Sequence, residues 1–343
     1  MILRGLACLG VILQALSICA LEVRVATVQF RSIDGAFYKN LAVATEFIDI
    51  AHEREAKIVL LPEFALIGYQ LSPDLWSLAE LANGRTVQAI SKLAQQHGMY
   101  IGTSFLEVDG EHFFNTFFLS GPYGKVLGRV KKQVPAGAEG YFFQGESGGH
   151  VIQTALGKIG IGICQENYRC FLPSHLYAGG ADFVLMPFSY PDLSQSGGLE
   201  SPKGSYIATW YANQLSIPIV TSNKTGSWPQ IEGAYFPGYS TIVNGSGQKL
   251  GELDDKPGVL IADISLIADM KSAPDAQCIG PYLMDLTIGS WFEKRVTWAG
   301  IWIADLFGMN PDEELHEAYL ASPGRRAAAR ALGGLSKVSN PPN

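Results

Sequence analysis

Several kinds of sequence signal are scarce in this chain of 343 residues. Lys and Arg total 25 against 32 Asp and Glu, the formal net charge is −7, and there is no long Lys/Arg run. A nucleic-acid partner is therefore not expected, because binding phosphates requires a basic patch. No internal repeat or low-complexity linker divides the chain. Hydrophobic residues make up 47% of it, which is enough for a large, well-ordered core.

Histidine and cysteine are also sparse. The six histidines show no paired metal-ligand spacing, so we predict no metal site. Two of the five cysteines, Cys8 and Cys19, lie within the first 21 residues. In an exported protein Cys170 and Cys278 could form a disulfide and leave Cys164 free, while unpaired buried thiols are the default expectation.

The N-terminal 21 residues differ from the rest of the chain. Arg4 supplies positive charge, and the stretch that follows it is almost wholly apolar but short for a membrane span. We interpret it as a signal peptide with a cleavage point near Ala20. Because Ile18 stands where a small residue is preferred, an uncleaved membrane anchor is the main alternative, and a buried helix of a cytosolic enzyme is a third. Either of the first two predicts an exported or membrane-anchored protein on the periplasmic or extracellular side.

From residue 22 to 265, β-rich runs alternate with helical stretches, which predicts one α/β domain. The expected helices span residues 38–54, 86–97, 173–178 and 206–215. The expected strands span residues 23–30, 58–61, 100–107, 115–120, 126–130, 151–154, 158–164, 183–186, 217–222, 239–243 and 259–263.

Residues 266–343 are predicted to form a helical C-terminal extension and tail. A wide apolar arc between residues 291 and 307 must be covered; one of its stripes carries Trp291, Trp298, Trp302 and Leu306. We expect this arc to pack on the domain or on a partner subunit, with a membrane-interface helix as the alternative. From Pro323 onward the Ala/Gly-rich sequence predicts a frayed helix or tail.

Three segments at the ends of predicted strands carry candidate catalytic residues, and open α/β sheets expose functional groups at such ends. In the first, Glu63 directly follows an apolar strand and Pro62. Partial desolvation of this carboxylate suits a general base. A glutamate at a helix N-terminus is the alternative explanation.

The second segment runs from Gly128 to Pro135 and carries Lys131 and Lys132, with Glu139 four residues beyond the proline. A lysine at a strand exit can stabilise an oxyanion, and a nearby carboxylate can keep it protonated. Two adjacent lysines are also common on a solvated surface.

The third segment delivers Cys164 from an apolar strand into a turn. The backbone N–H groups that follow such a cysteine can face a reacting carbonyl oxygen, which suits a nucleophile. An inert core thiol is the alternative.

These segments in this order resemble the carbon–nitrogen hydrolase (nitrilase) superfamily along nearly the whole span from Val23 to Asp263. The matching motifs are Leu61-Pro62-Glu63 with Gly68-Tyr69, then Gly128, Lys132, Pro135 and Glu139, and then Gly157-Lys158-Ile159-Gly160 before Cys164. Further matches are Tyr177 to Asp182, Ala212-Asn213 and Gly238-Tyr239-Ser240. The spacing from both Gly128 and Pro135 favours Lys132 over Lys131.

The resemblance implies a four-layer α-β-β-α sandwich that often dimerises, so we expect a homodimer or a larger homo-oligomer. It implies that Glu63 is the base, Lys132 the oxyanion stabiliser and Cys164 the nucleophile. Glu139 and the backbone N–H of Gln165 would support them. It implies hydrolysis of a small-molecule amide or nitrile through a thioester, with no metal or organic cofactor.

The substrate pocket is less well defined by the sequence. The residues proposed to line it are Tyr69, Trp76, Glu166, Phe188 and Tyr190, whose aromatic members could also simply pack. Gln165 stands where many members of the family carry an aromatic residue, and this leaves the substrate class open. The sequence from Cys164 to Asn167 is similar to that of true nitrilases, whereas amide hydrolases are more numerous in the superfamily.

Two other functions would use the same fold. An N-acyltransferase, which some membrane-associated relatives are, would pass the acyl group from Cys164 to an amine and would suit the apolar N-terminus. This chain lacks the multiple membrane spans of those relatives. A catalytically silent scaffold would bind a partner through residues 291–307, but the intact Glu, Lys and Cys set argues against it.

Overall fold

The computed structural model describes residues 21–169, 171–196, 204–266 and 319–332. Several features predicted from the sequence lie outside these residues. They are the N-terminal apolar segment, the apolar arc between residues 291 and 307, and every cysteine except Cys164.

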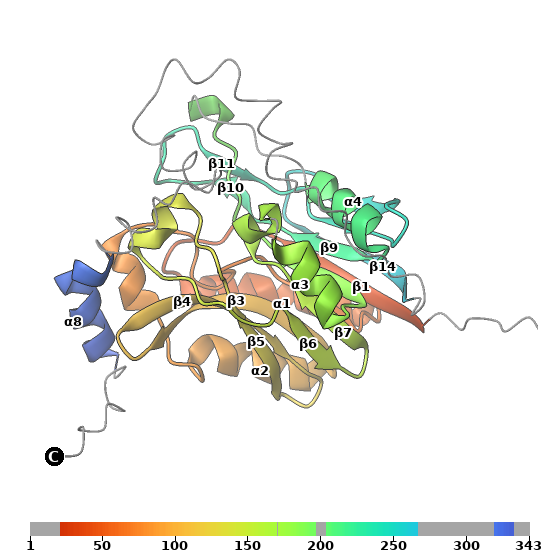
Figure 1. Cartoon of the computed structure of the whole chain (residues 1–343), viewed down its shortest axis with the longest axis horizontal. Helices are drawn as coiled ribbons and strands as arrows, with labels where there is room; N and C mark the ends of the chain where they lie inside the picture. Colours follow the sequence, from red (N-terminus) through yellow and green to blue (C-terminus); the bar gives the residue numbers. More distant parts are fainter. Residues whose placement is uncertain (1–20, 170, 197–203, 267–318, 333–343) are drawn as a thin grey trace, which may run out of the picture.

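The first of two large sheets has six strands in the order β14-β1-β2-β3-β4-β5. Strands β1, β2 and β3 run parallel, and the other neighbours are antiparallel. The strands are β1 Leu21–Gln29, β2 Ile58–Leu60, β3 Tyr100–Asp109, β4 His112–Ser120, β5 Val126–Lys131 and β14 Gly258–Leu266. Helices α1 (Phe37–Glu53) and α2 (Arg85–His97) cover its outer face (Figure 1).

The second sheet also has six strands, in the order β13-β12-β9-β8-β7-β6. Strands β7, β8 and β9 run parallel, and the other neighbours are antiparallel. The strands are β6 Val151–Thr154, β7 Gly157–Ile161, β8 Phe183–Pro187, β9 Ile219–Ser222, β12 Thr241–Val243 and β13 Lys249–Glu252. Helices α3 (Phe171–Gly179) and α4 (Gly204–Leu215) cover its outer face (Figure 1).

Alternation along β1 shows why four layers form. Val23 and Val25 belong to the core shared with the second sheet, whereas Ala26 and Val28 pack with residues of α1 and α2. Both faces of β1 are buried from Val25 to Gln29, and the buried polar residues Thr27 and Gln29 are hydrogen-bonded. The predicted four-layer α-β-β-α sandwich is confirmed.

The observed strands differ from the expected ones in specific places. The strand predicted to reach Cys164 ends at Ile161, and the cysteine instead begins a short 3₁₀ helix, η3 (Cys164–Tyr168). Three short strands were not predicted: β13 and the pair β10 (Thr225–Ser227) and β11 (Tyr235–Pro237). Strand β12 begins at Thr241, two residues after the predicted start.

The C-terminal segment corrects the expectation of a frayed helix. Helix α8 (Pro323–Ala331) is docked, with Arg325 and Ala329 buried. The Tyr319 hydroxyl accepts a hydrogen bond from the Phe113 N–H, and Arg325 donates to the carbonyls of Tyr319 and Glu111. These contacts fasten the segment to the β3–β4 hairpin, so tertiary packing stabilises a helix whose composition alone does not predict order.

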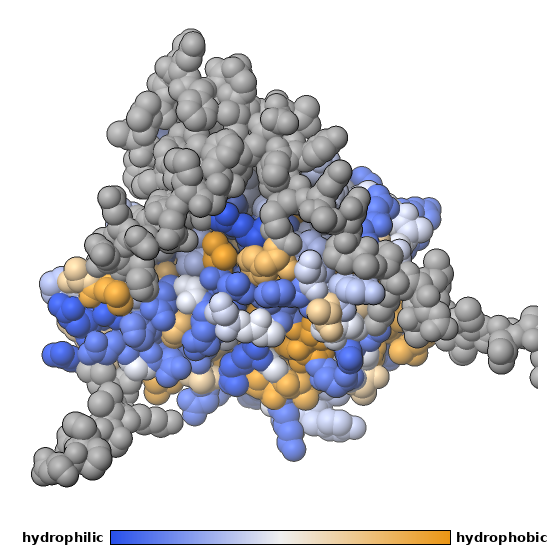
Figure 2. Space-filling model, viewed as in Figure 1, coloured by the Kyte–Doolittle hydropathy of each residue, from blue (hydrophilic) through white to orange (hydrophobic). Residues whose placement is uncertain are grey.

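The surface mixes polar and apolar residues, and the face in Figure 2 shows apolar patches among hydrophilic side chains. Within the parts of the chain that the structure describes, no helix has both the length and the apolarity needed to cross a bilayer.

Candidate active site

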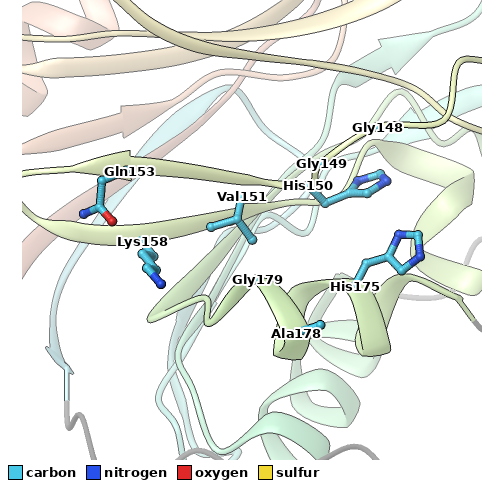
Figure 3. A pocket seen from close by; sticks show the side chains of 9 residues that line it. All are labelled: Gly148, Gly149, His150, Val151, Gln153, Lys158, His175, Ala178 and Gly179. Atoms are coloured by element: carbon cyan, nitrogen blue, oxygen red, sulfur yellow. The ribbon is translucent and has the colours of Figure 1, made fainter.

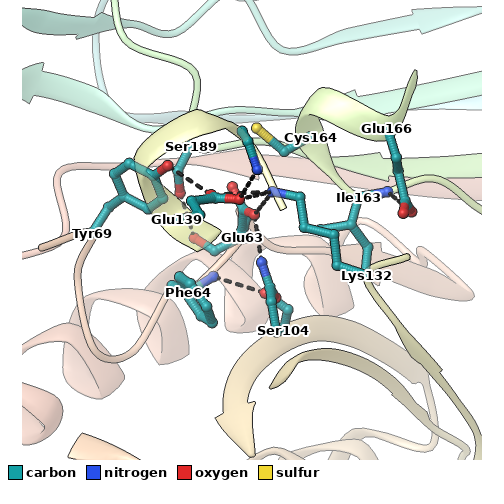
Figure 4. Close-up of polar contacts among 12 residues, drawn as sticks. Glu63, Phe64, Tyr69, Ser104, Lys132, Glu139, Ile163, Cys164, Glu166 and Ser189 are labelled. Carbon is teal, nitrogen blue, oxygen red and sulfur yellow. Dashed lines mark hydrogen bonds and ion pairs between the residues drawn. The ribbon is translucent and has the colours of Figure 1, made fainter. Parts of the chain in front are cut away.

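The three candidate catalytic residues each follow a strand end. Glu63 comes after β2, Lys132 directly after β5, and Cys164 after β7. The structure brings these residues, together with Glu139, into one buried cluster between the two sheets, as Figure 4 shows. Residues distant in the sequence therefore meet at the strand ends, where open α/β sheets place functional groups.

Lys132 lies between two carboxylates. Its Nζ is 3.0 Å from Glu63 Oε1 and 2.8 Å from Glu139 Oε2. All three side chains are fully buried. Because a buried cation is stable only when it is paired and hydrogen-bonded, this geometry holds the ammonium in one place. Lys131, by contrast, binds the partly exposed Glu146 at 3.0 Å.

Glu63 is held so that one carboxylate oxygen is committed and the other is available. Oε1 accepts hydrogen bonds from Asn115 Nδ2 at 2.6 Å and from Lys132 Nζ. Oε2 is buried and has no hydrogen-bond partner among the described residues. An unsatisfied buried acceptor is costly, so Oε2 is a reasonable place for a proton to arrive.

The backbone around Glu63 is also fixed. The Ser189 hydroxyl donates to the Glu63 carbonyl at 2.9 Å, and the Phe64 N–H donates to Ser104 Oγ at 3.0 Å. Phe64 has a φ of 48°, in the left-handed region that bulky residues rarely adopt. The surrounding contacts therefore stabilise a strained turn that aims the Glu63 carboxylate.

Cys164 occupies a second strained turn. Its φ is 52°, and η3 begins at this residue. Asn167 Nδ2 donates to the Cys164 carbonyl and to the Gly162 carbonyl, each at 2.9 Å, and the backbone of Ser189 hydrogen-bonds to the thiol. This sharp turn presents the sulfur towards Glu63 and Lys132 (Figure 4).

The electrostatics of the cluster favour a charged lysine and a protonated thiol. Burial alone would lower the pKa of Lys132, but Glu139 and Glu63 outweigh it and raise that pKa well above its ordinary value. Burial, assisted by Glu63, raises the pKa of Cys164 well above its ordinary value, although Lys132 opposes the shift. The resting thiol therefore keeps its proton at neutral pH and needs a base to become a nucleophile.

Glu139 and Tyr69 form the far side of the cluster. The Tyr69 hydroxyl donates to Glu139 Oε1 at 2.7 Å, and the Ala136 N–H donates to Glu139 Oε2 at 2.6 Å. Burial raises the pKa of Glu139, while Lys132 opposes the shift. Tyr69, proposed for the pocket, thus contacts the catalytic cluster through this carboxylate.

Glu166, also proposed for the pocket, has a different place in the structure. Its Oε1 accepts the Ile163 N–H at 2.7 Å and its Oε2 accepts the Gln133 N–H at 2.9 Å. Burial raises the pKa of Glu166 to about 7, against these two backbone hydrogen bonds. Its carboxylate therefore connects the segment that follows Lys132 to the turn that carries Cys164.

The three aromatic residues proposed for the pocket differ in their contacts. Trp76 packs against Phe113 and donates through Nε1 to the Phe142 carbonyl at 2.7 Å, so packing is the role that its contacts describe. Phe188 is buried, and its carbonyl accepts the Glu63 N–H at 3.3 Å. Tyr190 lies near the thiol: burial raises its pKa, and Cys164 contributes to the shift.

Gln165 directly follows Cys164, and its side chain is buried with Oε1 unpaired among the described residues. Its backbone N–H stands at the N-terminus of η3, where N–H groups lack partners within the helix. This position is compatible with the oxyanion-binding role predicted for it.

A separate surface pocket lies between the β6–β7 hairpin and α3, and its lining includes His150, Lys158 and His175 (Figure 3). None of the candidate catalytic residues lines it. In the described ranges, no group of three or more His, Cys, Asp or Glu side chains is arranged to hold a metal ion.

Sequence reasoning missed several polar residues of the site. They are Asn115, Ser104, Ser189, Asn223 and Lys224. The available signal was weak: Asn115 interrupts a run of aromatic residues in β4, and Lys224 follows the end of β9. Such positions are informative only once the strands are known to converge.

The buried cluster of Cys164, Glu63 and Lys132 on a four-layer sandwich agrees with the class of C–N bond hydrolases that the sequence resembles. The carbon–nitrogen hydrolase family matches residues 24–272, and this chain belongs to that family. The predicted family is therefore confirmed, and the protein is an enzyme of the amidase and nitrilase type that acts on C–N bonds other than peptide bonds.

Named relatives give the same class. The chain is 29% identical to N-carbamoylputrescine amidase from Arabidopsis thaliana over 71% of this chain and 87% of that protein. It is 27% identical to a citrullinase from Francisella tularensis, covering 68% and 85% of the two chains. It is 26% identical to a nitrilase from Pyrococcus abyssi, covering 68% and 87%.

Solved structures share the fold. A carbon–nitrogen hydrolase from Helicobacter pylori G27 superposes with a TM-score of 0.64 at 20% identity, covering 72% of this chain and 90% of that one. A mutant amidase from Nesterenkonia sp. AN1, with an acetamide moiety added covalently at its active-site cysteine, gives a TM-score of 0.60 at 23% identity. That comparison covers 72% of this chain and 91% of the amidase.

Proposed function

We propose that the protein hydrolyses a small-molecule amide through a thioester on Cys164. The observation that carries the proposal is the position of Lys132, held between Glu63 and Glu139 beside the thiol. A fully buried ammonium is costly to maintain, and a site where negative charge develops on a substrate oxygen gives it a function.

The first half-reaction forms the acyl-enzyme. Glu63 takes the proton of the Cys164 thiol, and the sulfur attacks the amide carbon. The oxyanion that results is stabilised by the Lys132 ammonium and the Gln165 backbone N–H. When the C–N bond breaks, Glu63 returns the proton to the leaving nitrogen, so a primary amide releases ammonia.

The second half-reaction hydrolyses the thioester. Glu63 removes a proton from water, and the resulting hydroxide attacks the thioester carbon. The same two donors hold the second oxyanion, and the proton on Glu63 goes back to the departing sulfur. Glu139 touches neither reacting bond in this scheme; it keeps Lys132 charged and in position.

The substrates to try first follow from the relatives. N-carbamoylputrescine amidase is named for a substrate with a carbamoyl group, and the other two relatives are a citrullinase and a nitrilase. We therefore propose primary amides and N-carbamoyl amines as the leading substrate classes, with nitriles next.

The test is intact-mass detection of an adduct on Cys164 together with assay of ammonia release across these three classes. We expect a covalent acyl adduct and ammonia from at least one class, and neither from the Cys164→Ala variant. Ammonia release that Cys164→Ala leaves unchanged would reject the mechanism. Addition of amine acceptors separates hydrolysis from acyl transfer, since a transferase would give the N-acyl amine in place of the acid.

A further inference from the structure

A second buried lysine lies beside the catalytic cluster and has no role in the proposed reaction. Lys224 follows β9 and is 1% exposed. Its Nζ donates to Ser32 Oγ at 2.9 Å and to the Phe64 carbonyl at 3.0 Å. An amine buried this deeply loses its hydration, and these two hydrogen bonds offset the cost and fix its position.

The contact with Phe64 bears directly on the general base. Phe64 follows Glu63 and has the strained φ of 48° described above. Its carbonyl accepts the Ile67 N–H at 3.3 Å and the Gly68 N–H at 3.1 Å from its own turn. Lys224 adds a side-chain donor from a distant segment, while Ser104 accepts from the Phe64 N–H. If the lysine donor were absent, the carbonyl would keep only local backbone donors, and the turn would lose the hydrogen bond that ties it to the segment after β9.

Asn223, the residue before Lys224, contacts the loop that lies next to Cys164. Asn223 Oδ1 accepts the Tyr190 N–H at 3.0 Å, and Asn223 Nδ2 donates to the Tyr190 carbonyl at 3.2 Å. Tyr190 follows Ser189, whose backbone hydrogen-bonds to the Cys164 thiol. Two consecutive residues after β9 thus fasten the turn of the base and the loop that contacts the thiol.

We propose that Lys224 is a positioning residue that sets the Glu63 turn relative to Cys164 through its hydrogen bond to the Phe64 carbonyl. The proposal rests on the proposed function, because the geometry matters only if Glu63 acts on the thiol. Misplacement of a general base by a fraction of an ångström slows the chemical steps more than it weakens substrate binding.

This role requires the N–H donors of Lys224 and does not require its positive charge. The Ser32 hydroxyl donates its own proton to the Ala65 carbonyl at 2.8 Å, so Ser32 Oγ must accept from the lysine. Two acceptors need two N–H donors, and a neutral amine still provides both. Burial lowers the pKa of Lys224 to about 7, although Glu63 and Asp34 oppose the shift. The anchoring bonds therefore survive the loss of the charge.

The experiment compares Lys224→Met with wild type and with Lys256→Met, which replaces a lysine whose side chain is 78% exposed and pairs with Asp254. For Lys224→Met we expect kcat to fall about 10- to 100-fold with KM changed less than about 3-fold. We expect Cys164 to be alkylated by iodoacetamide several-fold more slowly, as measured by peptide mass. Lys256→Met should match wild type in each measurement.

A second variant guards against misfolding. Lys224→Arg keeps donors for the Phe64 carbonyl, so we expect it to retain more kcat than Lys224→Met at equal native circular dichroism. A folded Lys224→Met enzyme with kcat and alkylation rate within twofold of wild type would overturn the proposal. So would an equal loss of kcat in Lys224→Arg and Lys224→Met when both variants are folded.

The two proposals fail in different ways. If wild type forms an acyl adduct that Cys164→Ala lacks, while Lys224→Met turns over normally, only the positioning role is lost. If wild type turns over none of the substrates, the proposed function is lost, and the alkylation rate still decides whether Lys224 sets the reactivity of the thiol.

Discussion

The pKa values of two buried lysines next to the same glutamate are shifted in opposite directions. Lys132 and Lys224 are equally inaccessible, yet the pKa of Lys132 is raised well above its ordinary value and that of Lys224 is lowered to about 7. The difference lies in the atoms that each ammonium contacts. Lys132 binds two carboxylates, whereas Lys224 binds a hydroxyl and a peptide carbonyl.

The comparison distinguishes two roles that a buried amine can have, as a cation and as a hydrogen-bond donor. Burial disfavours the charged form of both lysines, and only direct contact with carboxylates reverses that cost. A permanent cation can stabilise an oxyanion, while an amine whose charge is optional can serve as a hydrogen-bond donor to the backbone.

Removal of the cation should have the largest effect. For Lys132→Met we expect kcat to fall by about 10²- to 10³-fold, because the proposed oxyanion donor is lost. We also expect the free energy of unfolding to fall by about 3–5 kcal/mol, since Glu63 and Glu139 are left buried without their partner. Steady-state kinetics and urea denaturation measure the two effects.

Lys131→Met is the matched control for this variant, because Lys131 is the adjacent residue and contacts Glu146 at the surface. It should lose only about 1 kcal/mol of stability, because its partner Glu146 is half exposed and its Nζ contact with the Phe114 ring is weak. If Lys131→Met lost as much activity as Lys132→Met, the assignment of the oxyanion stabiliser would be wrong.

The pH dependence of stability should reveal the lowered pKa of Lys224. The native pKa is about 7 against an ordinary value of 10.5, so between these values the unfolded chain holds a proton that the native chain has released. Stability contributed by this group therefore rises with pH above about 7, by about 1 kcal/mol per pH unit. Denaturation at pH 7 and pH 9 measures the slope.

The comparison variant is again Lys224→Met, which cannot titrate. The free energy of unfolding of wild type should increase relative to that of Lys224→Met between pH 7 and pH 9. Parallel behaviour of the two proteins over this range would mean that Lys224 keeps its charge as Lys132 does, and the contrast would disappear.

The smallest expected effect tests how Glu139 supports Lys132. Tyr69→Phe removes only the hydroxyl that donates to Glu139 Oε1. We expect kcat/KM to fall about 3- to 10-fold, corresponding to about 1 kcal/mol for one lost hydrogen bond. No change would show that Lys132 and Ala136 hold Glu139 without help; a loss as large as that of Lys132→Met would assign the tyrosine a more direct role.

Much of the fold was predictable because inner strands such as β2 and β8 are buried at every position and carry continuous apolar runs. The failures occurred where that signal is weak. Strand β10 is only Thr225–Ser227, and it pairs with β11 beyond the two main sheets. Helix α8 was expected to fray, but Tyr319 and Arg325 fasten it to the β3–β4 hairpin. Export of the protein and its assembly into oligomers stay predictions.

The amino-acid order by itself determined the class of the enzyme, because short motifs place a glutamate, a lysine and a cysteine at the ends of apolar strands. Only the tertiary structure decided which groups these residues meet. Lys132 finds Glu63 across 69 residues of sequence, and Lys224 finds Phe64 across 160. Charge states depend on distances of a few ångströms between buried groups, and no local pattern in the chain encodes such distances.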